Sequence, residues 1–214
     1  MASPKRHDLQ IIHSSEESDW RTPEPLVAAL NKEEYDGIAI DLAADSQNRK
    51  FPIWLGPGSP HGEDALAVDW LALLARLDLV PIGFLNMPFS RKKARELKKA
   101  GDPRWRAYMV ETWAEKCWQE SQRGFTIYAV MPFAPQTDWY RKYVYGHENR
   151  ESMGQGWAGH AAMQERRLPH RISFLRPDGS PAENAGVNSV IVVWTPMTGV
   201  VGPWQPHSYY WSYR

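Results

Sequence analysis

Four consecutive residues, Asn86, Met87, Pro88 and Phe89, carry groups that could act together on a nucleotide base. The Asn86 amide oxygen and the Met87 carbonyl are acceptors, and each could take one hydrogen of the exocyclic amine of adenine. That amine is a poor nucleophile because its lone pair is delocalised into the ring, and two acceptors would draw the pair toward an electrophile. Phe89 would stack on the base, as in enzymes that act on a nucleotide swung out of its helix. An ordinary loop after a strand is the alternative interpretation.

An apolar run, Val80 to Leu85, comes directly before this loop. Four to six apolar residues that end at a polar group and a proline predict a buried strand followed by a turn. In open α/β sheets, ligands bind outside the carboxyl ends of the strands. The sequence therefore places Asn86 at a sheet edge where a ligand would be held.

A basic segment follows the loop. Residues 91–106 contain eight basic side chains and two acidic ones. We expect Ser90, Arg91, Lys92 and Lys93 to contact a phosphate backbone, which would bring a base to the loop. A solvated helix face is the alternative for such a charge run.

The composition indicates one globular domain. The 214 residues are 43% hydrophobic and 12% aromatic, which suffices for a sizeable core. The net charge is zero, which argues against unspecific nucleic-acid binding by the chain as a whole. The single cysteine, Cys117, suggests a reducing cytosol and is expected to be a buried apolar group. No apolar run of about twenty residues occurs, so we expect no membrane span.

A helix start and an acidic residue lie early in the chain. Thr22 is an N-cap candidate, with Pro23 at the first position of a helix that ends near Asn31. Asp41 lies near the carboxyl end of a predicted strand over residues 36–44. It could hydrogen-bond a hydroxyl or amine of a nucleoside-like cofactor, or it could cap the following turn.

A second acidic residue, Asp64, follows a segment over residues 47–63 that is rich in proline and glycine and is expected to be irregular. Asp64 is either a second polar contact to the cofactor or the N-cap of a helix that runs to about residue 76.

The rest of the chain alternates helices and strands. Residues 104–123 have apolar and aromatic residues near helical spacing, a helix is expected over 107–123, and Gly124 ends it. Residues 125–132 are predicted to form a strand parallel to the one before Asn86. The remaining expectations are a short helix from Thr137, a mobile segment over 147–167, and strands over 170–174 and 189–194, of which the second is central.

The two ends are expected to differ from the body. Residues 1–18 are predicted to be flexible, and residues 19–198 to form the domain. Residues 199–214 are rich in aromatic side chains, which either cover an apolar groove or stack on bases.

Other common motifs are missing from the sequence. The seven histidines form no metal-binding pattern, and no phosphate-binding glycine loop or nucleophile elbow occurs. No metal site is therefore predicted.

The landmarks together resemble the phage and prophage DNA N-6-adenine methyltransferase (Dam) family. They occur in order between residues 19 and 196. They are Asp19-Trp20-x-Thr22-Pro23, Asp41 to Ala44 with Asn48, Asp64-Ala-Leu-x-x-Asp69-Trp70, Phe84 to Ser90, Trp113, Gly124 with Met131-Pro132, Thr137-x-Trp139, Arg171 to Phe174, and Ser189 to Val193.

The resemblance implies an S-adenosylmethionine-dependent enzyme that methylates adenine in duplex DNA. Its fold would be α/β and Rossmann-like, with a mostly parallel central sheet and helices on both faces. The family is phage or prophage encoded, which implies the cytoplasm of a bacterial host cell.

The resemblance also implies roles for single residues. Thr22 and Pro23 would lie near the methionine end of the cofactor, and Asp41 would bind its amino-acid part or ribose. Ala43 lies where many methyltransferases have a glycine-rich cofactor loop, and Asp64 would lie beside the cofactor adenine. Asn86 to Phe89 would receive the target base.

Two positions depart from the family pattern. The family motif is Asn-Pro-Pro-Tyr, whereas this chain has Met87 and Phe89 at the second and fourth positions. Met87 keeps the carbonyl and Phe89 keeps the ring, so activity is expected to persist. The alternatives are an inactive methyltransferase-like module that binds nucleic acid or a protein, and an enzyme that attaches a different group to adenine.

Overall fold

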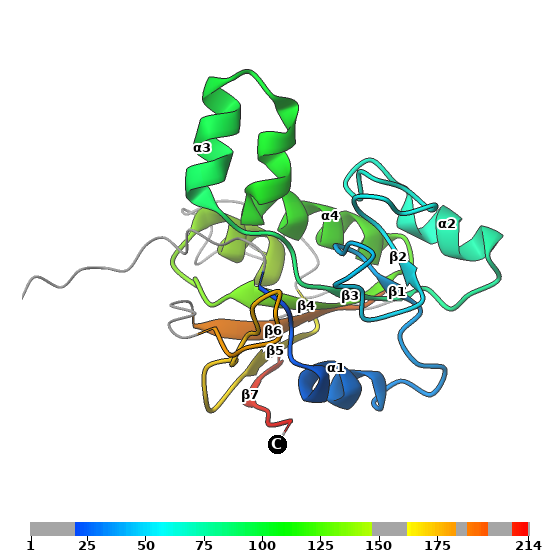
Figure 1. Cartoon of the computed structure of the whole chain (residues 1–214). Coiled ribbons are helices and arrows are strands. Elements are labelled where there is room, and N and C mark those ends of the chain that lie inside the picture. The colour runs from blue at the N-terminus through cyan, green and yellow to red at the C-terminus, as the bar shows by residue number, and fades with distance from the viewer. Residues whose placement is uncertain (1–19, 147–161, 183–187, 197–206, 214) are drawn as a thin grey trace, which may run out of the picture.

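A seven-stranded mixed sheet forms the centre of the molecule (Figure 1). The computed structural model describes residues 20–146, 162–182, 188–196 and 207–213. The order of the strands in the sheet is β2-β1-β3-β4-β6-β5-β7. The strands are β1 (Ile40–Asp41), β2 (Ile53–Trp54), β3 (Ile82–Leu85), β4 (Thr126–Pro132), β5 (Gln164–Arg167), β6 (Ser189–Trp194) and β7 (His207–Tyr210).

Most neighbouring strands in this sheet are parallel. Strands β2, β1, β3 and β4 run in one direction, and β5 pairs in parallel with β7. Among the described strands, only β6 runs against its neighbours, β4 and β5. The predicted mostly parallel sheet is therefore confirmed, and so is the parallel pairing of the strands that precede Asn86 and include residues 126–132.

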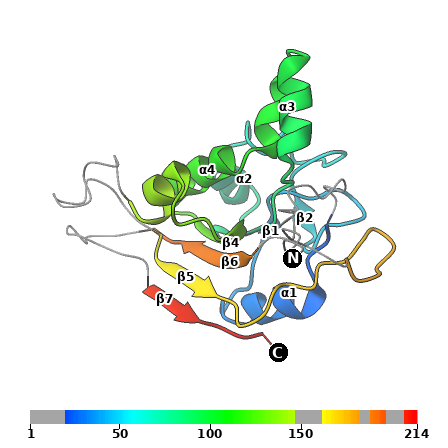
Figure 2. The same cartoon turned by 90° about the vertical axis from the view of Figure 1, so that its left-hand side faces the viewer.

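Helices cover both faces of the sheet, as predicted (Figures 1 and 2). Helix α1 (Glu24–Asn31) lies on one face, where it buries Leu26, Val27 and Leu30. Helices α2 (Trp70–Arg76) and α4 (Val110–Gln122) lie on the other face. The apolar residues of α4 recur at the spacing of a buried helical stripe, which explains why the sequence predicted this helix.

The sheet separates two hydrophobic cores because successive side chains of a strand point to opposite faces. In β4, Ile127, Ala129 and Met131 belong to the core beneath α2 and α4, whereas Tyr128 and Val130 belong to the core beneath α1. This double burial accounts for the nearly continuous apolar runs in β4 and β6.

A helical hairpin projects from the face that carries α4 (Figures 1 and 2). Its first part is α3 (Arg91–Lys99), and its second is the 3-10 helix η1 (Pro103–Tyr108). Gly101 has a φ of 72° between them, a left-handed conformation that glycine adopts without strain. The expected helix over 107–123 therefore begins later, at Val110.

Two predicted helix starts are wrong. Pro23, not Thr22, occupies the N-cap of α1, and the cap has no side-chain hydrogen bond. Asp69, not Asp64, caps α2, because its side chain accepts a hydrogen bond from the Ala72 N–H at 2.9 Å. Residues 64–69 precede this helix and are not part of it.

Several strand predictions also need correction. The strand expected over 36–44 contains only residues 40–41, and the segment expected to be irregular, 47–63, contains β2. Residues 170–174 form no strand, and the isolated bridges nearby involve the next residue, Leu175. Strand β5 lies instead in the segment expected to be mobile, and β7 lies in the aromatic tail. The interior position of β6 and the short helical segment near Thr137, η2 (Tyr140–Val144), agree with the predictions.

Some predictions fall on residues outside the described ranges. These are the flexible segment 1–18, the part of 147–167 before residue 162, and residues 199–206 of the tail. None of the described helices is long and apolar enough to cross a membrane.

Candidate functional site

The order of the strands creates a switch point between β1 and β3. From β1 the chain first adds β2 on one side, and it then returns to add β3 and β4 on the other side. In open α/β sheets, ligands bind in the crevice outside the carboxyl ends of the strands at such a point. Asp41 is the last residue of β1, and Asn86 directly follows β3.

The two strands bring these residues close to each other. Asp41 pairs with Phe84 in the sheet, and Asn86 lies two residues beyond Phe84. The Leu42 N–H donates to the Phe84 carbonyl at 2.8 Å, which continues the pairing past the end of β1. Sequence reasoning thus located two side chains that the fold places at one edge.

The Asn86 side chain is oriented by a contact from the start of the described chain. Its Nδ2 donates to the Trp20 carbonyl at 3.2 Å. Because a carbonyl only accepts, the NH₂ end of the amide must face Trp20, and Oδ1 therefore points away from that carbonyl. Asn86 is half-buried.

Trp20 is itself held in place. Its ring stacks on Phe174 at 5.8 Å, and Arg21 and Leu175 exchange main-chain hydrogen bonds of 2.8 and 2.9 Å. Sequence reasoning gave Trp20 only as a landmark of the resemblance. Nothing in the local sequence shows that its carbonyl positions Asn86, because the two residues are far apart along the chain.

The rest of the loop is partly core. The Met87 side chain is 6% exposed and packs in the core beneath α2 and α4, and Phe89 is partly buried against the same core. Pro88 is half-buried. The Met87 side chain is thus fixed by packing, while its carbonyl is the group relevant to an incoming amine.

The Asp41 carboxylate binds main-chain groups of its own loop. One oxygen accepts from the Ala43 N–H at 3.3 Å and the other from the Lys50 N–H at 2.9 Å. The residue is 3% exposed. Burial raises the pKa of Asp41 to about 6, although the two N–H donors act in the opposite direction. These contacts are the turn-capping role that the sequence left open beside cofactor binding.

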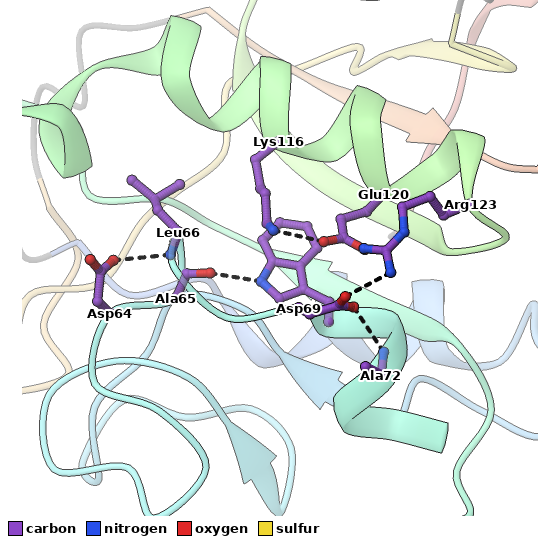
Figure 3. Close-up of polar contacts among 9 residues, drawn as sticks. Asp64, Ala65, Leu66, Asp69, Ala72, Lys116, Glu120 and Arg123 are labelled. Atoms are coloured by element: carbon purple, nitrogen blue, oxygen red, sulfur yellow. Dashed lines mark hydrogen bonds and ion pairs between the residues drawn. The ribbon is translucent and has the colours of Figure 1, made fainter. Parts of the chain in front are cut away.

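The other residues predicted to bind the cofactor lie in different surroundings. Thr22 is 2% exposed and precedes Pro23 at the start of α1. Ala43 is half-buried. Asp64 is exposed, and it closes a turn by accepting from the Leu66 N–H at 3.1 Å. Figure 3 shows that Asp64 does not take part in the ion pairs between α2 and α4.

Those ion pairs support the helices on one face of the sheet (Figure 3). Arg123, the C-cap of α4, binds Asp69 at 2.7 Å and Glu120 at 3.3 Å, and Lys116 binds Glu120 at 2.7 Å. Trp70 lies below Lys116, with 5.2 Å between the ammonium nitrogen and the ring centroid. The Arg123–Asp69 pair connects the end of α4 to the start of α2, while the buried Glu120 is held by Lys116 and Arg123 of the same segment.

The basic residues after the loop are exposed. Ser90 caps α3 by accepting from the Lys93 N–H at 3.2 Å. Arg91, Lys92 and Lys93 are exposed, and the Lys93 ammonium lies 4.6 Å from the Tyr108 ring centroid.

Three buried polar atoms near the carboxyl edge find no hydrogen-bond partner within the described part of the chain. They are Arg21 Nε, Asn48 Oδ1 and Trp54 Nε1. Trp54 ends β2, and the Arg49 guanidinium lies 4.4 Å from its ring centroid. A buried polar atom without a partner costs stability unless a ligand or water binds it. Arg21 Nε and Trp54 Nε1 are donors, and Asn48 Oδ1 is an acceptor.

Sequence reasoning did not assign Arg21 or Trp54 a role. The available signal was a tryptophan within a segment rich in proline and glycine. Cys117 is fully buried, and burial raises the pKa of its thiol well above the usual range, so it is not a nucleophile. No group of three or more metal-binding side chains occurs among the described residues.

Comparison with family models, curated proteins and solved structures finds no match to the chain. The resemblance therefore stands on the motifs of the sequence alone.

Proposed function

We propose that this chain is a DNA adenine methyltransferase, which transfers a methyl group from S-adenosylmethionine to the N-6 amine of a flipped adenine. One observation carries the proposal. The Asn86 loop lies at the switch point of the sheet, and the Trp20 carbonyl binds Nδ2 and so leaves Oδ1 to accept from a base. The fold would then be the Rossmann-like methyltransferase fold, in a protein of the bacterial host cytoplasm.

The loop residues have separate tasks in this reaction. Asn86 Oδ1 and the Met87 carbonyl accept the two hydrogens of the amine, which turns its lone pair out of the plane of the base. Phe89 stacks on the base, and its partial burial against the core keeps the ring in position. When bound, S-adenosylmethionine supplies an electrophilic methyl group on a sulfonium sulfur. The nitrogen gains a bond to the methyl carbon, the carbon–sulfur bond breaks, and the amine proton leaves to water.

This reaction requires little from the titratable side chains of the protein. The protein contributes positioning and exclusion of water, because the methyl donor is already reactive. Arg21, Asn48 and Trp54 offer the polar atoms to hold the cofactor, beside Thr22 and Pro23. Asp41 acts by fixing the loop over residues 41–50, since its carboxylate binds main-chain N–H groups there.

The test is transfer of label from S-adenosylmethionine to duplex DNA that contains adenine. We expect labelled N-6-methyladenine with the wild type, and a loss of roughly 10²–10³-fold with Asn86→Ala, the range measured when one positioned hydrogen-bonding group is removed. Gln119→Ala removes an exposed amide from α4 and is the matched control. Equal labelling by Asn86→Ala, with folding verified by circular dichroism, would remove Asn86 from the mechanism.

A second candidate is a methyltransferase-like module that transfers nothing. It is favoured by Asp41, whose carboxylate oxygens both bind the protein main chain. Calorimetry with S-adenosylmethionine separates the two candidates, because the module need not bind this ligand. An enzyme that attaches a different group would instead give modified adenine with another mass.

A further inference from the structure

The helical hairpin of residues 90–109, here called the basic arm, is an addition to the sheet and its covering helices. The crossover between the parallel strands β3 and β4 is provided by α4, which packs on the sheet. In α3 only Ala94 is buried, and η1 buries no residue. Since the arm contributes almost nothing to either core, the stability of the fold does not explain its sequence.

The outer surface of the arm is strongly basic. Residues 91–106 have eight basic and two acidic side chains. Lys92, Arg95 and Lys99 lie on the side of α3 opposite Ala94, and all three are exposed. Glu96 is the single acidic residue of α3 and shares that side.

The aromatic rings of η1 hold cations of the arm. The Lys98 ammonium lies 4.8 Å and the Arg106 guanidinium 5.7 Å from the Trp105 ring centroid. The Lys93 ammonium lies 4.6 Å from the Tyr108 ring centroid. Rings that already bind cations are poorly placed to stack on bases, so the arm presents charge rather than a stacking surface.

The arm also begins next to the base-binding loop. Ser90 caps α3 and directly follows Phe89. A duplex held along α3 would therefore have a nucleotide within reach of Asn86.

We infer that the basic arm binds the phosphate backbone of duplex DNA without reading its sequence, through the outer face of α3. This inference rests on the proposed function, because the partner is the DNA that the loop would modify. Sequence preference would then come from other parts of the molecule.

The test measures binding of a labelled duplex by fluorescence anisotropy over a series of salt concentrations, without cofactor. Each phosphate contact contributes about 0.9 to the slope of log K against log salt, so Arg95→Gln with Lys99→Gln should lower the slope by about 1.8. The decrease in the slope should be the same for duplexes of unrelated sequence. Lys32→Gln with Arg76→Gln removes two exposed cations outside the arm and should leave the slope unchanged.

A substitution that removes a negative charge instead of a positive one completes the test. Glu96→Gln removes a negative charge from the same face, so we expect it to strengthen binding at low salt and not at high salt. The inference would be overturned if the slope were unchanged in the arm variant or fell equally in the control variant. It would also be overturned if the slope fell for only one DNA sequence. The methylation assay on the wild type is separate: if no methyl is transferred but the slope falls as expected, the proposed function fails and the arm remains a DNA-binding element.

Discussion

Asp41 shows how a single buried carboxyl gives the fold a pH dependence. The residue is 3% exposed, and its pKa is raised to about 6 from the ordinary 3.8. The folded state therefore binds a proton more strongly than the unfolded chain between these two values. The free energy of unfolding contributed by this group falls as the pH rises from about 4 to about 6, by about 3 kcal/mol in total, and is constant above that.

The prediction concerns the difference between wild type and Asp41→Asn, because other carboxyls also titrate in this range. An asparagine cannot ionise, so the variant should lose less stability than the wild type between pH 4 and pH 6. Urea unfolding at pH 4, 5, 6 and 7 measures this. Parallel pH curves for the two proteins would show that Asp41 does not titrate in this window.

Met87 is the residue at which the sequence argument was least complete. The comparison with the family motif considered only the main-chain carbonyl of Met87. In the structure, however, the Met87 side chain is 6% exposed within the core beneath α2 and α4. Restoring the proline would therefore remove a packed side chain as well as restrict the backbone.

We expect Met87→Pro to be less stable than the wild type. Removal of a buried methionine side chain costs about 2–5 kcal/mol, and the proline returns about 0.4–1 kcal/mol of unfolded-state entropy. The net loss should be about 1–5 kcal/mol in urea unfolding. Met87→Leu keeps the volume and should cost less than about 1.5 kcal/mol. A Met87→Pro protein as stable as the wild type would mean that the loop can repack.

At the scale of elements, strands with continuous apolar character were predictable. Helices cover both faces of the sheet, so its interior strands are apolar along their whole length. This continuous apolar character predicted the strands at residues 82–85, 126–132 and 189–194. Strand β5 has the sequence Gln-Glu-Arg-Arg and carries no such signal. Its Glu165 is fully buried, accepts from the Tyr140 hydroxyl at 2.6 Å, and binds Arg167 at 2.9 Å. The Tyr140 hydroxyl, from 25 residues earlier in the chain, helps to make this burial possible, so hydropathy could not reveal it.

The wrong strand over residues 170–174 has the opposite cause. Ile172 and Phe174 alternate with polar residues, which is typical of a strand, and both are buried beneath α1. The alternation thus located the inward side chains correctly. It could not show that this extended segment lacks a neighbouring strand with which to form a ladder.

The arrangement of the whole sheet determines which site residues lie close together. The sequence placed Asp41 and Asn86 at strand ends, and the strand order brought these ends together at the switch point. The Trp20 carbonyl and the unpartnered atoms of Arg21 and Trp54 depend on contacts between distant segments, which no local pattern encodes. Residues with reactive groups can thus be found from the sequence, whereas the residues that orient them are found only from the folded structure.

The C-terminal strand connects the far edge of the sheet to α1. Strand β7 pairs with β5, and the Trp211 N–H then donates to the Arg167 carbonyl at 2.9 Å. The Trp211 indole donates to Glu33 at 3.0 Å, and its ring centroid lies 5.4 Å from the guanidinium of the buried Arg166. Trp211 thereby covers an ion pair of 2.7 Å between Arg166 and Glu33.

We expect Trp211→Ala to lower the free energy of unfolding by about 1–3 kcal/mol, less than the loss of a fully buried tryptophan because Trp211 is half-buried. Tyr210→Ala is the control: this neighbour is 76% exposed, so its loss should stay within about 0.5 kcal/mol. Urea unfolding of the two variants measures the contrast, and equal losses would show that the tail does not stabilise the domain through Trp211. Because β7 and the basic arm are attached to different strands, the salt slope of DNA binding should be the same in Trp211→Ala as in the wild type under conditions in which both are folded.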